Sequence, residues 1–163
     1  MPAHILPAAA CFVVCLAALA APLLAARGHQ TAAAVLYLAF SGICHQIRER
    51  SFLLCGHPLA VCHRCAGVYL GLLLAAAFAR PHASQSPQAR RLRVVASVAP
   101  LALDAVLERA GLWHGTGAVR FVTGVLFGAG TWPLLACGVA EWLDELRRRG
   151  AAVGEPHLKE GLP

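Results

Sequence analysis

A chain of 163 residues with 58% hydrophobic and only 13% charged residues is too apolar for an ordinary soluble domain, in which about 25% of residues are charged. Its net charge of +6 does not indicate nucleic-acid binding, because the arginines lie at the ends of apolar blocks and in one connecting segment. Length and composition therefore exclude a typical soluble enzyme and favour a single-domain integral membrane protein.

Five apolar blocks predict an all-α fold, a polytopic membrane helix bundle of about five transmembrane helices. Blocks of about 18 or more apolar residues are long enough to span a bilayer, and a second, shorter block is the exception here. No Lys or Arg precedes the first block, so we expect a retained span and no cleaved signal peptide. The domain covers residues 1–145, with a polar cytoplasmic tail over 146–163 and spans at about 5–26, 31–45, 59–79, 92–108 and 118–140.

Two pairs of glycines share the same spacing in the third and fifth blocks. Gly67 and Gly71 are four residues apart, and Gly124 and Gly128 repeat that interval. Small residues at this spacing lie on one face of a helix and let a neighbouring helix approach closely. We therefore expect close helix packing along both blocks.

The distribution of basic residues predicts the orientation of the spans. If residues 80–93 are cytoplasmic, nine of the fourteen Lys and Arg side chains lie on the cytoplasmic side and five on the other. Because basic residues concentrate in cytoplasmic loops, the N-terminus is expected outside and the C-terminus inside. This topology predicts that the most reactive residues of the chain share the non-cytoplasmic layer of the membrane.

Soft metal ligands and thiols are concentrated in residues 41–71. Cys62 and Cys65 form a C-x-x-C motif at a predicted helix start, and positions three apart share one helix face. Cys44 and His45 lie across the preceding loop and complete a set of three cysteines and one histidine, which suits tetrahedral zinc. A copper ion or haem iron is also compatible with such ligands. Cys55, His57 and His63 are spare candidates.

The same C-x-x-C spacing leaves two other interpretations open. The pair could work as a redox dithiol in a membrane thiol–disulfide oxidoreductase, since a helix N-terminus and a neighbouring arginine acidify such thiols. It could instead form a disulfide that staples the outer loop, because extracytoplasmic cysteines commonly pair. In that case the protein would be a structural or transport helper subunit.

Charged residues inside the predicted spans form a second group. Charges in spans are usually paired or face a cavity, so Asp104 and Arg120 are expected to pair across the hairpin that joins the last two spans. Glu108 lies one turn after Asp104 on the same face, and Tyr69 lies one turn after Cys65. Arg50, like Arg48, is either part of a solvated turn or contacts a lipid phosphate or a bound anion. These residues are predicted to surround the metal site or to line an access cavity, with a purely structural ion pair for Asp104 and Arg120 and plain packing for Tyr69 as the alternatives.

With these residues in hand, the chain resembles the DUF2085 family of predicted bacterial and archaeal membrane proteins. The resemblance covers roughly residues 36–130 and is carried by Cys44-His45-Gln46, by Pro58-Leu59-Ala60-Val61-Cys62-His63-Arg64-Cys65-Ala66-Gly67, by Leu103-Asp104 and by Arg120-Phe121-Val122-Thr123-Gly124. It implies a multi-pass protein of the bacterial or archaeal inner membrane and no particular reaction. Cys55 lies outside the family's pattern, which leaves Cys44, Cys62 and Cys65.

These observations also set the expected partners. The lipid bilayer is the expected environment, nucleic acid is not expected, a small-molecule substrate stays unassigned, and a homo-oligomer stays open.

Overall fold

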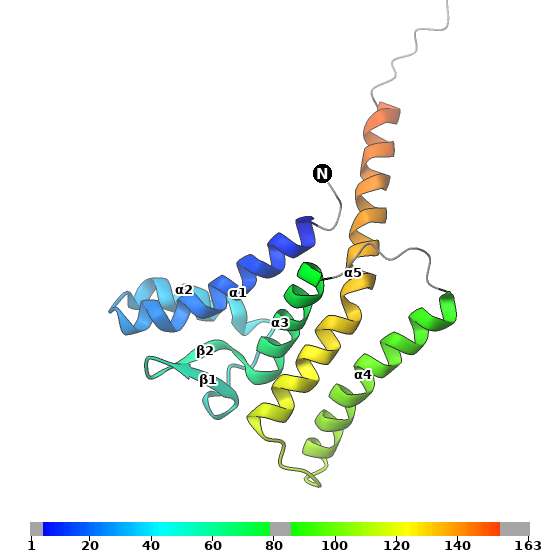
Figure 1. The fold of residues 1–163 in the computed structure, drawn as a ribbon. Helices are drawn as coiled ribbons and strands as arrows, with labels where there is room; N and C mark the ends of the chain where they lie inside the picture. Colours follow the sequence, from blue (N-terminus) through cyan, green and yellow to red (C-terminus); the bar gives the residue numbers. More distant parts are fainter. Residues whose placement is uncertain (1–4, 79–85, 154–163) are drawn as a thin grey trace, which may run out of the picture.

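The computed structural model describes residues 5–78 and 86–153, which form five α-helices and one two-stranded β-hairpin (Figure 1). The mostly helical fold agrees with the sequence prediction. In chain order the elements are α1 (Ile5–Ala26), α2 (Gln30–Ser41), a 3-10 turn (Arg48–Arg50), β1 (Ser51–Leu54), β2 (His57–Cys62), α3 (His63–Phe78), α4 (Pro87–Arg109) and α5 (Gly117–Val153).

The β-hairpin corrects the all-α expectation and the start of the third predicted span, because residues 59–62 are strand. Its two-residue turn is Cys55-Gly56, with φ values of 52° and 82°, and Leu54 pairs directly with His57. Two consecutive residues with positive φ match the right-handed twist of paired strands. The apolar run before the C-x-x-C motif therefore enters the core as a strand, and α3 begins only at His63.

The ends of three helices also differ from the predicted spans. α2 ends at Ser41 and does not continue to residue 45. α4 begins at Pro87, earlier than the expected residue 92, because the Ser86 hydroxyl accepts a hydrogen bond from the Ala89 N–H at 3.3 Å and proline suits a first helical turn. α5 continues to Val153, so the first part of the predicted polar tail is helical. Ala79 and residues 154–163 of these predictions lie outside the described residues.

The two glycine pairs face each other where α3 and α5 lie side by side (Figure 1). A Cβ atom on Gly67 would clash with the backbone carbonyl of Phe121, and one on Gly124 would clash with that of Arg64. Gly71 and Gly128 repeat the arrangement one turn further along. The expected close packing is confirmed, and it brings the backbones of α3 and α5 into direct contact.

The remaining helices pack on either side of this pair. α1 contacts α2, β2 and α3, and in Figure 1 the α1–α2 hairpin runs across the direction of α3 and α5. α4 packs against α5, where Gly130 leaves room for the side chain of Ser97. The buried core lies where α1, α2 and β2 meet and consists of Ala18, Ala21, Phe40, Cys44, Leu59, Ala60 and Val61.

Two helices in the described part of the chain are long and apolar enough to cross a membrane. They are α1 and the Gly117–Arg149 part of α5, whereas α2 and α3 are apolar but shorter. The 12 residues of α2 extend about 18 Å, less than the roughly 30 Å of a hydrocarbon core. The number of crossings and their orientation stay predictions.

Candidate metal centre

The structure brings three of the four predicted metal ligands together. The sulfur atoms of Cys44, Cys62 and Cys65 all lie within 4.8 Å of one another. Cys44 is buried, and Cys62 and Cys65 are half-buried. Cys44 follows the end of α2, Cys62 is the last residue of β2, and Cys65 lies in the first turn of α3. Three thiols from three adjoining segments therefore share one small volume at the edge of the core.

Hydrogen bonds hold the cysteine-bearing segments in place. The backbone N–H of Cys62 donates to the sulfur of Cys44 at 3.1 Å. The Tyr37 hydroxyl donates to the Pro58 carbonyl at 2.6 Å, and the Gln46 amide donates to the Tyr37 carbonyl at 2.7 Å. These contacts join α2, the segment that follows it and β2. The hairpin thus returns the chain to Cys44 and places Cys62 beside it.

One of the three thiols, that of Cys62, is more acidic than an ordinary cysteine. The pKa of Cys62, which lies in β2 outside the membrane-spanning helices, is lowered to about 5, because the Cys65 thiol donates a hydrogen bond to its sulfur. Burial acts in the opposite direction, and the Cys65 N–H, the Cys44 thiol and the Arg64 N–H lower the pKa further. Cys62 is therefore set up as a thiolate, the form that binds metals and attacks disulfides.

His45 is not part of the sulfur cluster. Its side chain is exposed, and it lines the cavity next to the cysteines. The spare candidates also lie elsewhere: Cys55 is exposed at the hairpin turn, His57 lines a separate cavity, and the His63 ring packs edge-on against Phe52 at 4.4 Å. Tyr69 packs against the buried core one turn beyond Cys65. The structure thus assigns only the three cysteines to a shared ligand cluster.

A cluster of buried and half-buried ion pairs lies beside the cysteines; we call it the arginine cluster, and it consists of Arg50, Arg64, Arg120, Asp104 and Glu108. Arg64 donates through Nε to Asp104 Oδ2 at 3.0 Å and through Nη2 to Glu108 Oε2 at 2.6 Å. Arg120 donates to Glu108 Oε1 at 2.7 Å, and Arg50 lies 3.0 Å from the same oxygen. The expected pairing of Asp104 with Arg120 is not what the structure shows, because Arg64 takes Asp104 and Arg120 takes Glu108.

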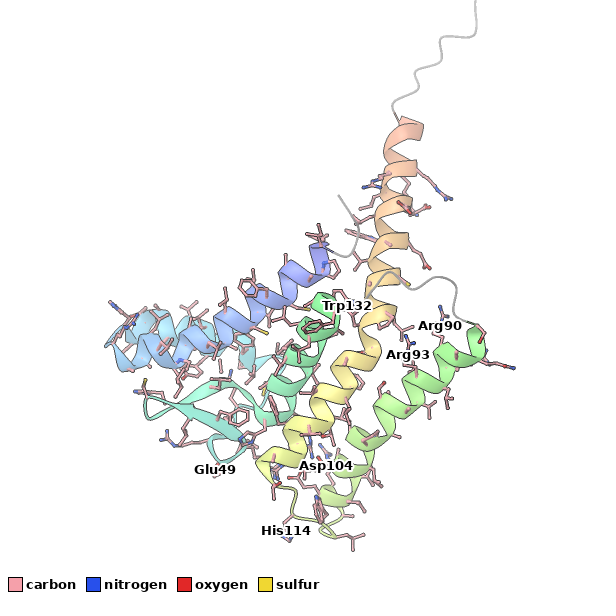
Figure 2. The ribbon with its side chains drawn as sticks, viewed as in Figure 1. Glu49, Arg90, Arg93, Asp104, His114 and Trp132 are labelled. Carbon is pink, nitrogen blue, oxygen red and sulfur yellow. The ribbon has the colours of Figure 1, made fainter. Side chains whose placement is uncertain are left out.

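Arg64 is the residue that sequence reasoning undervalued. It lies between the two cysteines of the C-x-x-C motif, yet its side chain joins α3 to α4 through two carboxylates. The signal was present in the sequence, since an arginine at the start of an apolar helix needs a partner and the i, i+4 pair Asp104 and Glu108 offers two. Figure 2 shows Asp104 near the C-terminal end of α4, beside α5, with Arg90 and Arg93 at the opposite end of α4.

One cavity of about 390 Å³ connects the two clusters. Its wall includes the three cysteines and His45 together with Arg50, Arg64, Arg109, Arg120 and Glu108. Asp104 is buried with 6% of its surface exposed and supports Arg64 from behind. A ligand in this cavity would meet both sulfur atoms and guanidinium groups.

Comparisons with known proteins identify a family but no activity. A family model described as "Predicted membrane protein (DUF2085)" matches residues 44–133, a range that contains the three cysteines and the whole arginine cluster. A protein of Methanocaldococcus jannaschii that is named only as uncharacterized is 33% identical over 96 residues, or 57% of this chain and 61% of that relative. A second uncharacterized protein, from Methanothermobacter thermautotrophicus, is 33% identical over 91 residues, or 56% of this chain and 82% of the relative.

The match has a limited extent. The aligned part of the chain spans about three fifths of the length of the Methanocaldococcus relative. No solved structure matches the chain.

Proposed function

The chain belongs to the DUF2085 family of predicted membrane proteins, and from this premise we propose that it binds a divalent metal ion, zinc in the first place, through Cys44, Cys62 and Cys65. The observation that carries the proposal is the convergence of the three sulfur atoms within 4.8 Å. Thiolates are soft ligands that select zinc, copper and iron–sulfur centres over magnesium or calcium. The chemistry of the donor set thus points to a thiophilic ion.

The spacing of the sulfurs suits a tetrahedral ion. Zinc–sulfur bonds of about 2.3 Å in a tetrahedron place the sulfur atoms about 3.8 Å apart. The observed limit of 4.8 Å leaves only small side-chain rotations to complete such a site. The backbone N–H of Cys62 donates to the Cys44 sulfur at 3.1 Å and holds that sulfur next to the other two. Three protein ligands are also the usual number in zinc sites that keep one position open.

His45 follows Cys44 directly and lines the cavity next to the three sulfur atoms, so its side chain after a rotation, or a water molecule in the cavity, would supply a fourth ligand to a bound ion. The role of Asp104 and Glu108 is to hold Arg64 and Arg120 on the wall of the same cavity. In this proposal His45→Ala lowers zinc affinity, whereas loss of any of the three cysteines abolishes binding.

Metal analysis of the purified protein tests the proposal. The wild type, purified in detergent under anaerobic conditions, is expected to carry about one zinc per chain, and Cys62→Ser is expected to carry none. Cys55→Ser is the matched control, because Cys55 lies in the same hairpin but is exposed outside the sulfur cluster. Equal zinc content in the two variants would refute the assignment, and a thermal unfolding curve shows that each is folded.

A thiol–disulfide oxidoreductase is the second candidate, favoured by the C-x-x-C pair at the start of α3. In such a reaction the Cys62 thiolate attacks a disulfide of a partner protein and forms a mixed disulfide. Cys65 then displaces the partner's second sulfur, so that a Cys62–Cys65 disulfide forms and the partner leaves reduced to a dithiol. A metal-free protein that loses two thiols per chain with a disulfide reagent and regains them with dithiothreitol would favour this candidate.

We also propose that the protein is a multi-pass protein of the bacterial or archaeal cell membrane with both clusters toward the outer side. The basic start of α4 lies at the opposite end of that helix from Asp104, about 21 Å from Arg90 at 1.5 Å per residue (Figure 2). A basic end favours the cytoplasm. A reporter that is active only in the cytoplasm, inserted within residues 80–85, should be active; an inactive reporter there would reverse the orientation.

A further inference from the structure

The arginine-lined wall of the cavity has more positive charge than its carboxylates balance. We propose that this cavity binds a small oxyanion, a phosphate-like or carboxylate group, on the wall formed by Arg50, Arg64, Arg109 and Arg120. The inference depends on these side chains and on the cavity, and it stands whether or not the neighbouring cysteines hold a metal.

The charge balance is the first argument. Four guanidinium groups line the cavity, and within the described residues only Glu108 on its wall and Asp104 behind it make ion pairs with them. A divalent ion on three thiolates would add a single negative charge. One positive charge therefore stays without a counterion even in the metal-loaded state. The surplus charge lies with Arg50 and Arg109, whose side chains are exposed, so a bound anion would gain the attraction of guanidinium groups that the two carboxylates do not fully neutralise.

The arginines that line the cavity differ in exposure and in the carboxylates they contact. The side chains of Arg120 and Arg64 are only 12% and 24% exposed, and both already share the carboxylate of Glu108. Arg109 follows Glu108, is exposed, and makes no ion pair among the described residues. Arg109 can thus turn its guanidinium toward a ligand without breaking an existing contact.

The geometry selects oxyanions over simple halides. A guanidinium group presents paired N–H donors in one plane, which match two oxygens of a phosphate or carboxylate. Arg64 is the second residue of α3 and Arg120 the fourth of α5, so two helix N-termini add partial positive charge, against one C-terminus from α4. The volume of about 390 Å³ lies within the usual range for small-molecule sites, roughly 300–1,000 Å³.

Two sources could supply this anionic group, a soluble anion or the head group of a membrane lipid, and the test separates them. The probes are inorganic phosphate and dihexanoyl phosphatidic acid, a short-chain lipid with the same phosphate group. Binding is measured by titration calorimetry at constant ionic strength on the full chain in a non-ionic detergent. The variants are Arg109→Gln and Arg50→Gln, and the matched control is Arg90→Gln, an exposed arginine at the opposite end of α4.

We expect the wild type and Arg90→Gln to bind at least one probe equally, and Arg109→Gln and Arg50→Gln to bind about tenfold more weakly, as for a lost hydrogen bond to a charged group. Tighter binding of phosphate identifies a soluble anion, and tighter binding of the lipid identifies a head group. Binding that persists in Cys62→Ser separates this inference from the metal proposal. No binding of either probe, or equal affinity in all three arginine variants, would overturn it.

Discussion

The cysteine cluster and the arginine cluster line one cavity, but the chain builds them in different ways. The three cysteines lie within residues 44–65 and meet because one hairpin returns the chain to the end of α2. The arginine cluster uses residues 50–120 and forms only when α3, α4 and α5 are packed together. The cysteine cluster therefore depends on local structure, whereas the arginine cluster requires the correct packing of α3, α4 and α5.

The glycine contact between α3 and α5 is the feature on which the arginine cluster depends most directly. Gly124 packs against the carbonyl of Arg64, and Gly67 packs against that of Phe121, which follows Arg120. The separation of Arg64 and Arg120 is thus set by backbone contact and not by flexible side chains. Variants that change this contact should affect the arginine cluster more than the cysteine cluster.

The largest effect is expected from Asp104→Asn, which removes a buried charge and keeps the size of the side chain. Arg64 keeps Glu108 but loses its more deeply buried partner, so we expect destabilisation of about 3 kcal/mol in detergent unfolding experiments. Zinc content of the variant that stays folded should be unchanged, because Asp104 is not a ligand.

The control for this variant is Asp144→Asn, which removes an ion pair with Arg147 whose side chains are 63% and 69% exposed. Such exposed pairs contribute less than about 1 kcal/mol. Equal destabilisation by the two substitutions would show that the arginine cluster does not hold α3 and α4 together.

A smaller effect is expected from Gly124→Ala, which places a methyl group against the backbone of α3. We expect a loss of about 1–3 kcal/mol, as for other overpacked contacts, together with weaker phosphate binding and retained zinc. Gly138→Ala in the same helix meets nothing within 4 Å and should be neutral or slightly stabilising. If Gly124→Ala lost zinc but kept anion binding, the claim that the α3–α5 contact supports the arginine cluster more than the cysteine cluster would be wrong.

The last prediction involves the smallest change to the fold and is specific to the cysteine cluster. It is the pH dependence of the rate at which the Cys62 thiolate reacts. Its pKa of about 5 lies below the usual thiol value of about 8.5, so chelator-treated protein keeps the thiolate as the pH falls from 8 to 6 and loses it only near 5. Iodoacetamide should therefore modify Cys62 at a nearly constant rate between pH 8 and 6, whereas an ordinary thiol slows about tenfold per pH unit. Mass spectrometry of the modified peptide follows the rate.

The donor of the hydrogen bond provides the counterpart experiment. In Cys65→Ala the main stabilisation of the Cys62 thiolate is removed, so the rate of Cys62 modification should fall steeply over the same pH range. A flat profile in Cys65→Ala would show that another group lowers the pKa.

For the candidate site, the sequence predicted correctly those contacts whose residues lie close together in the chain. Cys62 and Cys65 were expected on one helix turn; Cys62 is instead the last residue of β2, but it directly precedes α3, and the three-residue spacing still brings the two sulfur atoms together. Cys44 was recognised as their neighbour across a short connection. His45 adjoins Cys44 in sequence, but it lies on the exposed cavity wall because adjacent residues leave the backbone in different directions. The pairing of Arg64 with Asp104 could not be derived, because it depends on how α4 is placed against α3 and α5, 40 residues away.

For the fold, apolar blocks located the helices but not their ends. The hairpin was missed because its turn uses Cys55 where asparagine, aspartate or glycine is usual, and because the buried strand Leu59–Val61 has the same apolar pattern as a helix. The fourth helix was expected to begin only at residue 92, although proline after a serine cap, as at Ser86-Pro87, is a common helix start. The glycine pairs, in contrast, correctly predicted close packing. A glycine face lets any neighbouring helix approach closely, so the prediction did not require knowledge of which helix is the partner.

The length of α5 also has a consequence for the depth of the cavity. Its 37 residues extend about 55 Å, and even at a tilt of about 40° they cover roughly 42 Å along the membrane normal, more than a hydrocarbon core of about 30 Å. The helix is therefore longer than a single crossing needs, and a crossing by its apolar first two thirds would leave the exposed Asp144–Arg149 segment in water at its far end. Arg120, in the first turn of the same helix, would then hold the cavity at the opposite end of that crossing.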